Sequence, residues 1–292
     1  MSKKRSNRWV IALFADIHCG SRLALLPPGM VLYTIGLTGA KEPWTPSLTP
    51  GQVELWELYQ EHIKAVMKFA DGDPVCVVLV GDPTQGGKFK DELVCGDIPN
   101  QVAIASACIE EWLKYGVKYL RLAAGTDVHE FGESAATRLL AEYLAVKYPK
   151  VSVEWTYHEL LDIEGVTIDF AHHGPGAGKR IWLEMNNALW YLRDIVWRHI
   201  RRGQTPPILV VRADKHSYGK CAYTLSLGDR DVTTTMFVIP SYQTLTNFAR
   251  KVTQSAYEVY HGMIAVEVID GELARVKRLV QLIDLRRKES LK

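Results

Sequence analysis

Short apolar runs that each stop at carboxylate or imidazole side chains constrain the fold of this 292-residue chain most strongly. The first run extends from Trp9 to Ala15 and stops at Asp16 and His18, and a second run at 75–80 stops at Asp82. A continuous apolar run of this length, bounded by polar residues, is typical of a strand that is buried on both faces. The pattern therefore predicts buried strands whose ends carry polar side chains.

Three later segments, 117–123, 166–171 and 208–212, repeat this arrangement. They lead into Gly125-Thr126-Asp127-Val128-His129-Glu130, His172-His173-Gly174 and Asp214-Lys215-His216. Active sites of α/β folds gather beyond the carboxyl ends of strands. Carboxylate and imidazole groups together suit zinc, manganese or iron, and their number here is enough for a pair of ions that share one bridging carboxylate.

The segments between these runs indicate how the strands are connected. Apolar residues recur every three or four positions, as in helices, at 52–70, 98–115, 132–147 and 182–200. Further strands are predicted at 151–156, 221–227, 232–239, 256–269 and 273–283. Residues 19–50 are rich in proline and glycine and are predicted to form a long loop or small insertion. The whole pattern predicts one layered α/β domain over residues 1–292 with two packed sheets.

The polar segments also match, in order, the motifs of a known family. Asp16-x-His18, Gly81-Asp82, a glycine-led third segment, a later histidine and a final x-x-His resemble the calcineurin-like metallophosphoesterase family over about residues 9–240. The specificity comes from the ordered combination, since each fragment alone is common. The resemblance implies a four-layer α/β/β/α sandwich of two mixed β-sheets flanked by helices. It also implies two divalent metal ions (Mn, Zn, Fe or Ni, with Mn the most suited to activity).

The first metal position follows the family pattern closely. The resemblance assigns Asp16 and His18 to the first ion, together with His216, which matches the last histidine of the fifth motif. Asp82 matches the carboxylate that bridges both ions.

The second metal position is predicted through substitutions. His172 or His173 matches the fourth-motif histidine, and His172 is favoured because it follows its strand directly. The family's Gly-Asn-His has become a longer segment, similar to that of phage-borne members, in which Asp127 or Thr126 could replace the amide ligand. Asp214 stands where the family has a histidine, and a carboxylate oxygen is an acceptable ligand.

The resemblance also implies the reaction. Two cations lower the pKa of a bridging water, and the resulting hydroxide attacks phosphorus in line with the leaving oxygen. His129 matches the third-motif histidine and is the expected general acid, so that His129 and Asp82 are the predicted catalytic residues.

The expected substrate is a phosphate ester, and we favour phosphodiesters in nucleic acid or nucleotides. The reasons are the phage-like third motif, basic residues at 198–202, and Lys179 and Arg180, which are expected to bind substrate phosphate. The segment that carries them is no P-loop, because His173 and Arg180 replace its first glycine and its Ser/Thr. A phosphomonoesterase and a non-catalytic binding or assembly protein with a decayed metal site are the alternatives.

The helix predicted at 182–200 allows two interpretations. Its tryptophans, Trp182, Trp190 and Trp197, are typical of a core or an interface, with base stacking as the alternative. The arginines at its end suit the helix dipole, with phosphate binding as the alternative.

Composition and the lengths of the apolar runs indicate the compartment of the protein and its relation to membranes. The five cysteines are odd in number and form no Cys-x-x-Cys pair, which favours a reducing compartment over a disulfide framework. The N-terminal apolar run is too short for a signal peptide, and no run approaches the roughly 20 apolar residues of a membrane span. A cytoplasmic protein without a membrane partner is expected. The net charge of +2 argues neither for nor against nucleic acid. The histidines outside the motifs are expected at the surface or at helix caps: His62, His158, His199 and His261.

Overall fold

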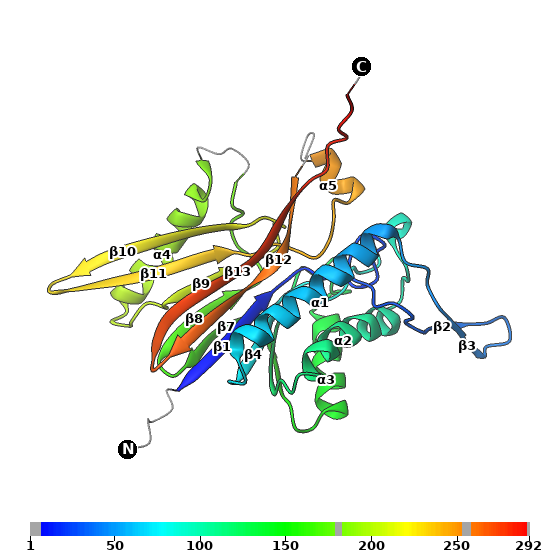
Figure 1. Ribbon diagram of the computed structural model, residues 1–292, viewed down its shortest axis with the longest axis horizontal. Helices are drawn as coiled ribbons and strands as arrows, with labels where there is room; N and C mark the ends of the chain where they lie inside the picture. Colours follow the sequence, from blue (N-terminus) through cyan, green and yellow to red (C-terminus); the bar gives the residue numbers. More distant parts are fainter. Residues whose placement is uncertain (1–6, 179–182, 253–257, 291–292) are drawn as a thin grey trace.

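The computed structural model describes residues 7–178, 183–252 and 258–290, whose strands form two large mixed sheets and one hairpin (Figure 1). The larger sheet has the order β13 (Glu272–Asp284), β12 (Glu258–Ile269), β1 (Arg8–Phe14), β4 (Val75–Val80), β5 (Tyr119–Ala123) and β6 (Ser152–Thr156). The second sheet has the order β10 (Gly219–Leu227), β11 (Arg230–Val238), β9 (Leu209–Arg212), β8 (Val166–Ala171) and β7 (His158–Ile163). The protein therefore has a mixed α/β fold.

The register of the parallel strands brings the polar segments to one edge. In the larger sheet β1 pairs with β4 up to Phe14 and Leu79, and β4 pairs with β5 up to Val80 and Ala123. In the second sheet β8 and β9 are also parallel neighbours. Because parallel neighbours end together, the segments that follow these strands emerge side by side.

Alternation along the central strands divides the apolar side chains between two cores. In β1, Val10, Ala12 and Phe14 pack with the helices, while Ile11 and Leu13 pack with the second sheet. β4 alternates in the same way. This period of two lets one strand serve both faces of the sheet, which is why its sequence is continuously apolar.

Three long helices, α1 (Pro50–Ala70), α2 (Ile98–Leu113) and α3 (Ala135–Lys147), lie together on one side of the larger sheet (Figure 1). Thr49 begins α1 through a reciprocal capping box with Gln52, and Asp71, in the left-handed conformation, ends it. A fourth helix, α4 (Asn186–Arg201), packs Ala188 and Leu192 against the second sheet. A short helix, α5 (Asn247–Val252), follows β11.

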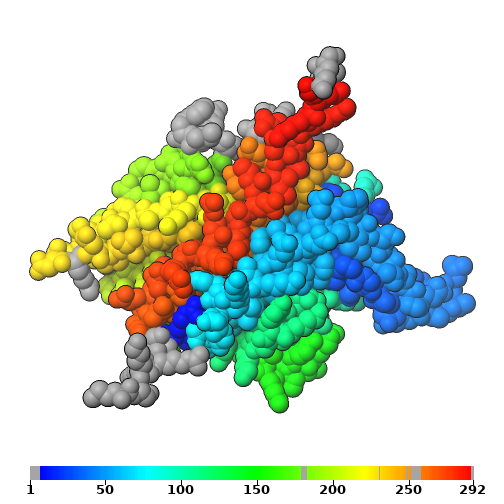
Figure 2. Space-filling model, in the orientation of Figure 1, coloured from blue at the N-terminus to red at the C-terminus, as the bar shows by residue number. Residues whose placement is uncertain are grey.

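Several elements differ from the prediction. The region predicted as a loop at 19–50 contains a hairpin, β2 (Leu32–Ile35) with β3 (Lys41–Trp44), which projects from the body (blue, Figure 2). Strand β7, the single-turn helix η1 (Lys90–Glu92) and α5 were not predicted.

The start of one predicted helix and the positions of two histidines also differ from the prediction. The helix expected from 182 begins at Asn186, after Met185 in a left-handed conformation, and Trp182 lies outside the described residues. His62 and His261 are buried instead of lying at the surface; their Nδ1 atoms lie within hydrogen-bond distance of Tyr242 Oη and the Ser241 carbonyl. In the described part of the chain, no helix is both long and apolar enough to cross a membrane.

Candidate metal centre

Five strand ends bring eight histidine and aspartate side chains together. In the described residues they form four groups of three whose potential ligand atoms lie within 4.8 Å of one another. The groups are Asp16–His18–His216, His18–Asp82–His129, Asp16–Asp82–His172 and His172–His173–Asp214. Four residues belong to two groups each, so the groups form one continuous cluster. Imidazole nitrogens and carboxylate oxygens at these spacings can hold metal ions.

One end of the cluster is formed by Asp16, His18 and His216. The Nε2 atoms of His18 and His216 lie 3.1 Å apart, and Asp16 Oδ1 lies 3.3 Å from His216 Nε2 and 3.7 Å from His18 Nε2. Three donor atoms therefore surround one small volume. This is the set of residues that the sequence assigned to the first metal position.

The other end of the cluster is formed by His172, His173 and Asp214. The two oxygens of Asp214 lie 4.0 Å from His172 Nε2 and 3.5 Å from His173 Nδ1. Asp82 lies between the two ends, because its Oδ2 is 3.2 Å from His172 Nε2 and 3.7 Å from His18 Nε2. Its carboxylate is therefore within reach of both.

Backbone carbonyls orient two of the imidazoles. His172 Nδ1 lies 2.8 Å from the Val80 carbonyl, and His129 Nδ1 lies 2.8 Å from the Gln85 carbonyl. Since a carbonyl can only accept, each Nδ1 donates, which leaves each Nε2 free to face the cluster. Metal-binding histidines are commonly held through the other ring nitrogen in this way.

Burial of unpartnered polar atoms shows that the cluster suits cations. Asp16 Oδ1 and His18 Nδ1 are buried and make no hydrogen bond within the described residues. A buried polar atom without a hydrogen bond costs about 1–3 kcal/mol, and more where the group is charged, so a positive charge beside Asp16 Oδ1 would be favoured. The oxygen and nitrogen donors fit divalent transition-metal ions.

The pKa shifts of Asp16 and His172 also show that the cluster favours positive charge. Burial opposes ionisation of Asp16, yet His216 and His172 lower its pKa. Burial likewise opposes protonation of His172, but Asp82 and Asp16 raise its pKa to about 10. Burial lowers the pKa of His18 to about 4, which keeps this imidazole neutral at pH 7. The carboxylates therefore draw positive charge toward themselves, and a metal ion supplies it without protonating the ligands.

The backbone at the cluster is strained. Asp16, His18, Asp82, Asp214 and His216 all have positive φ, between 40° and 69°. The left-handed region costs a non-glycine residue about 1 kcal/mol or more, and such residues concentrate at functional sites. Hydrogen bonds hold the strained segments: the backbone N–H groups of Asp16 and His18 donate to the carbonyls of Gly81 and Asp82, each at 3.1 Å.

Two glycines allow the segments to approach closely. Gly81 has φ of 88°, and a Cβ there would overlap the His172 ring. A Cβ at Gly125 would overlap the Asp82 carboxylate. Gly81 therefore requires glycine for both space and conformation, and Gly125 requires it for space.

The third segment, residues 125–130, distinguishes between the two alternatives, Asp127 and Thr126, that the sequence left open. Asp127 is exposed and belongs to none of the four groups, whereas the Thr126 N–H donates to Asp82 Oδ1 at 2.6 Å and its Oγ1 lies 3.3 Å from His172 Nε2. Buried Glu130 shapes the segment by accepting from the Gly125 N–H at 2.7 Å and from Thr137. Lys179 and Arg180, the predicted phosphate contacts, lie outside the described residues.

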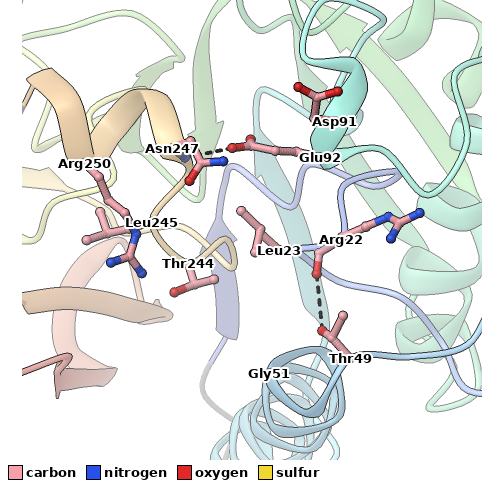
Figure 3. A pocket seen from close by; sticks show the side chains of 10 residues that line it. All are labelled: Arg22, Leu23, Thr49, Gly51, Asp91, Glu92, Thr244, Leu245, Asn247 and Arg250. Carbon is pink, nitrogen blue, oxygen red and sulfur yellow. Dashed lines mark hydrogen bonds between the residues drawn. The ribbon is translucent and has the colours of Figure 1, made fainter. Parts of the chain in front are cut away.

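A cavity of about 440 Å³ is lined by residues outside the cluster, among them Arg22, Glu92 and Thr244 (Figure 3). The segment after β11 connects the two, because the Tyr242 N–H donates to the Asp16 carbonyl at 3.1 Å and Thr244 lines the cavity. Glu92 lines it as well; its Oε1 accepts from the Asn247 N–H at 2.7 Å, and its buried Oε2 has no hydrogen-bond partner among the described residues. No sequence motif indicated this cavity, since its walls come from four distant segments.

The fold and cluster define a mixed α/β protein with a histidine–aspartate centre at its strand ends. No protein-family model and no curated protein matches the chain. Among solved structures, the NAD nucleotidase of Haemophilus influenzae (NadN) is similar at a TM-score of 0.37 and 12% identity, covering 94% of this chain and 50% of that chain. The chain thus spans about half the length of that nucleotidase. At this level of similarity, function has to be inferred from the geometry of the centre.

Proposed function

We propose that this protein is a dinuclear, metal-dependent phosphoesterase with a four-layer α/β/β/α sandwich of the calcineurin-like type. The observation that carries the proposal is the overlap of four potential ligand groups in one cluster. Asp16, His18 and His216 would hold one ion, and His172 with Asp214 would hold the other. Asp82 lies within reach of both. When bound, a pair of divalent ions supplies Lewis acidity that activates water and offsets phosphate charge.

The residues of the chain have separate tasks in this proposal. The buried carboxylates of Asp16 and Asp82 would hold the cations, and their charge would act strongly because water is excluded from them. His129 lies edge-on to His18, with ring centroids 4.5 Å apart, and its Nδ1 is fixed by the Gln85 carbonyl. A proton on His129 Nε2 would therefore be held in a defined direction for transfer to the leaving oxygen.

Among phosphate esters, we favour phosphodiesters of nucleic acid or nucleotides over phosphomonoesters. A diester carries organic groups on both sides of the phosphate and needs two surfaces beside the centre. The cavity at Glu92 offers one surface, reached from Asp16 along the segment that carries Tyr242 and Thr244. Helix α4 offers another, because Met185, just before it, donates its N–H to the carbonyl of Ala177 in the loop that follows His173. A monoester would need only one of them.

Metal analysis and paired substrates test the proposal. The purified protein is stripped with a chelator, dialysed, and loaded with Mn²⁺. We expect two ions per chain and faster turnover of bis-p-nitrophenyl phosphate than of p-nitrophenyl phosphate. Preference for the monoester would instead support the phosphomonoesterase alternative. One ion or none, with neither ester hydrolysed under Mn²⁺, Zn²⁺, Fe²⁺ or Ni²⁺, would support a non-catalytic binding protein.

A further inference from the structure

The outward face of α4 carries large aromatic side chains. Trp190 is 60% exposed and Trp197 is 44% exposed. Seven residues separate them, so they lie on the same side of the helix, two turns apart. On the opposite side Ala188 and Leu192 pack with β9 and β11 of the second sheet, and Val196 is buried. Packing within the described chain therefore does not account for the exposed tryptophans.

Arginines alternate with these tryptophans along the same stripe. Arg193 and Arg201 follow Trp190 by three and eleven positions, the intervals that keep residues on one helix face. Arg198, eight positions after Trp190, lies beside this stripe, about 80° around the helix, and its side chain is 65% exposed. The Arg193 guanidinium lies 4.6 Å from the centroid of the Trp190 ring and 5.3 Å from that of Tyr223. Over Asn186–Arg201 three arginines and one aspartate give a net charge of +2, with His199 neutral. The stripe is therefore both aromatic and cationic.

The stripe leads away from the metal cluster. Met185, just before α4, donates its N–H to the Ala177 carbonyl at 2.6 Å. The loop that carries Ala177 also lies against residues 214–216, which follow β9: a Cβ on Gly176 would lie 3.1 Å from Lys215 Cγ. Lys215 in turn donates to Asp214 at 2.7 Å. A helix of 16 residues extends about 24 Å from this point.

We propose that the exposed face of α4 binds single-stranded nucleic acid, with bases stacked on Trp190 and Trp197 and phosphates held by Arg193, Arg198 and Arg201. Proteins that bind single strands combine aromatic platforms with a basic track, and every base has a face that can stack. The two tryptophans are about 10 Å apart along the helix axis, the span of about three nucleotides at 3.4 Å each. That the bound strand is also the substrate rests on the proposed phosphodiesterase activity; binding itself does not.

Fluorescence anisotropy with a 5′-fluorescein-labelled 15-nucleotide oligothymidylate tests binding. The full chain is kept in chelator, so that no cleavage occurs. Base stacking on an aromatic ring is worth about 1–3 kcal/mol per base, so we expect Trp190→Ala and Trp197→Ala each to raise Kd about tenfold. Arg198→Ala should make the slope of log affinity against log salt shallower by about 0.7, the contribution of one phosphate contact on a single strand.

Helix α3 provides matched controls. Tyr143 is 46% exposed, like Trp197, and the Arg138 side chain is 63% exposed, close to the 65% of Arg198. Both arginines pair with an acid at the (i, i+4) spacing. Tyr143→Ala and Arg138→Ala should leave Kd and the salt slope unchanged. Circular dichroism spectra and thermal midpoints of all variants check that the fold is intact.

The outcomes separate the two proposals. Oligonucleotide binding by a wild-type protein that hydrolyses no ester would contradict the proposed function alone. Hydrolysis of bis-p-nitrophenyl phosphate without oligonucleotide binding would contradict the α4 proposal alone. Equal Kd values for wild type and the tryptophan variants would overturn it too, as would binding of phosphatidylserine vesicles in place of the oligonucleotide.

Discussion

At the scale of single residues, two buried carboxylates dominate the electrostatics of the centre. Asp16 and Asp82 are almost fully buried, and their neighbours in the cluster are mainly imidazoles, which can accept or share positive charge. Removing one charge while keeping the shape of the side chain therefore tests the centre most directly.

Asp82→Asn should remove one metal ion per chain and lower kcat at least about a hundredfold, because the carboxylate within reach of both ends of the cluster loses its charge. Metal content and bis-p-nitrophenyl phosphate turnover measure the effect. Asp127→Asn is the matched control, since Asp127 is exposed and outside the four groups. Turnover at the wild-type level in Asp82→Asn would show that the proposed bridge is wrong.

His129→Ala should slow hydrolysis about 10²- to 10⁴-fold, the usual range for loss of a general acid, while both metal ions stay bound. Substrates with better leaving groups need less protonation, so the loss should shrink as the leaving group becomes more acidic. A variant that loses metal instead would make His129 a ligand, which its place beside His18 and Asp82 also permits.

At the scale of elements, most strands could be predicted from the sequence, whereas β7 and the β2–β3 hairpin could not. β1 and β4 are apolar on both faces, so their runs are continuous, and ligand-type residues directly follow them. β7 is an edge strand with polar residues among its apolar ones, and the β2–β3 hairpin contains glycine and proline signals that resemble a loop. Pattern alone did not reveal either of them.

The same distinction applies within the centre. Residues at strand ends were predictable because the sheet fixes their positions. The choice between Thr126 and Asp127 was not, because it depends on the turn after β5, which buried Glu130 shapes through Gly125 and Thr137. The contact of Tyr242 with Asp16 joins segments more than 200 positions apart, and no local pattern encodes it.

An ion-pair network joins the strands at one side of the larger sheet. Buried Glu267 of β12 accepts from Arg8 of β1 at 2.6 Å and from Arg275 of β13 at 2.7 Å. Arg8 also donates to the carbonyls of Phe69 and Ala70 at the end of α1. The hydrogen bonds from Arg275 and Arg8 lower the pKa of Glu267 to about 2.

Glu267→Gln should lower the free energy of unfolding by about 2 kcal/mol at pH 7, because two guanidinium groups lose their charged acceptor. Because the pKa of Glu267 is lower in the folded chain, its ionised carboxylate stabilises the fold at pH values above its unfolded pKa of about 4.3. This contribution disappears as the pH falls through about 2. Urea unfolding of both proteins should therefore show a smaller difference at pH 2.5 than at pH 7. A difference that does not depend on pH would contradict the ionic role, and Glu272→Gln, at an exposed position of β13, is the control.

At the scale of the whole molecule, the two cores and the centre depend on each other. Strands of both sheets supply the ligand segments, so the centre exists only when the sheets are packed together. Ions that bind only the folded chain stabilise it by mass action.

Mn²⁺ at about 100 times its Kd should therefore raise the free energy of unfolding by about 2.7 kcal/mol per ion, or roughly 4–5 °C in the thermal midpoint for a domain of this size. Differential scanning fluorimetry across a Mn²⁺ titration measures the shift, and Asp16→Asn should reduce it. A midpoint that does not respond to Mn²⁺, Zn²⁺, Fe²⁺ or Ni²⁺ would show that no ion binds preferentially to the folded chain.

The left-handed conformations at Asp16, His18, Asp82, Asp214 and His216 have a consequence for protein engineering. Glycine adopts these angles without strain, so a search for thermostable variants by backbone conformation alone would choose glycine at all five positions. Such a search would remove the histidine and aspartate side chains of the centre while relieving backbone strain. The same positions can instead guide redesign: because the main chain fixes where each side chain starts, exchanging histidine and aspartate among them would alter the preferred metal with little change to the scaffold.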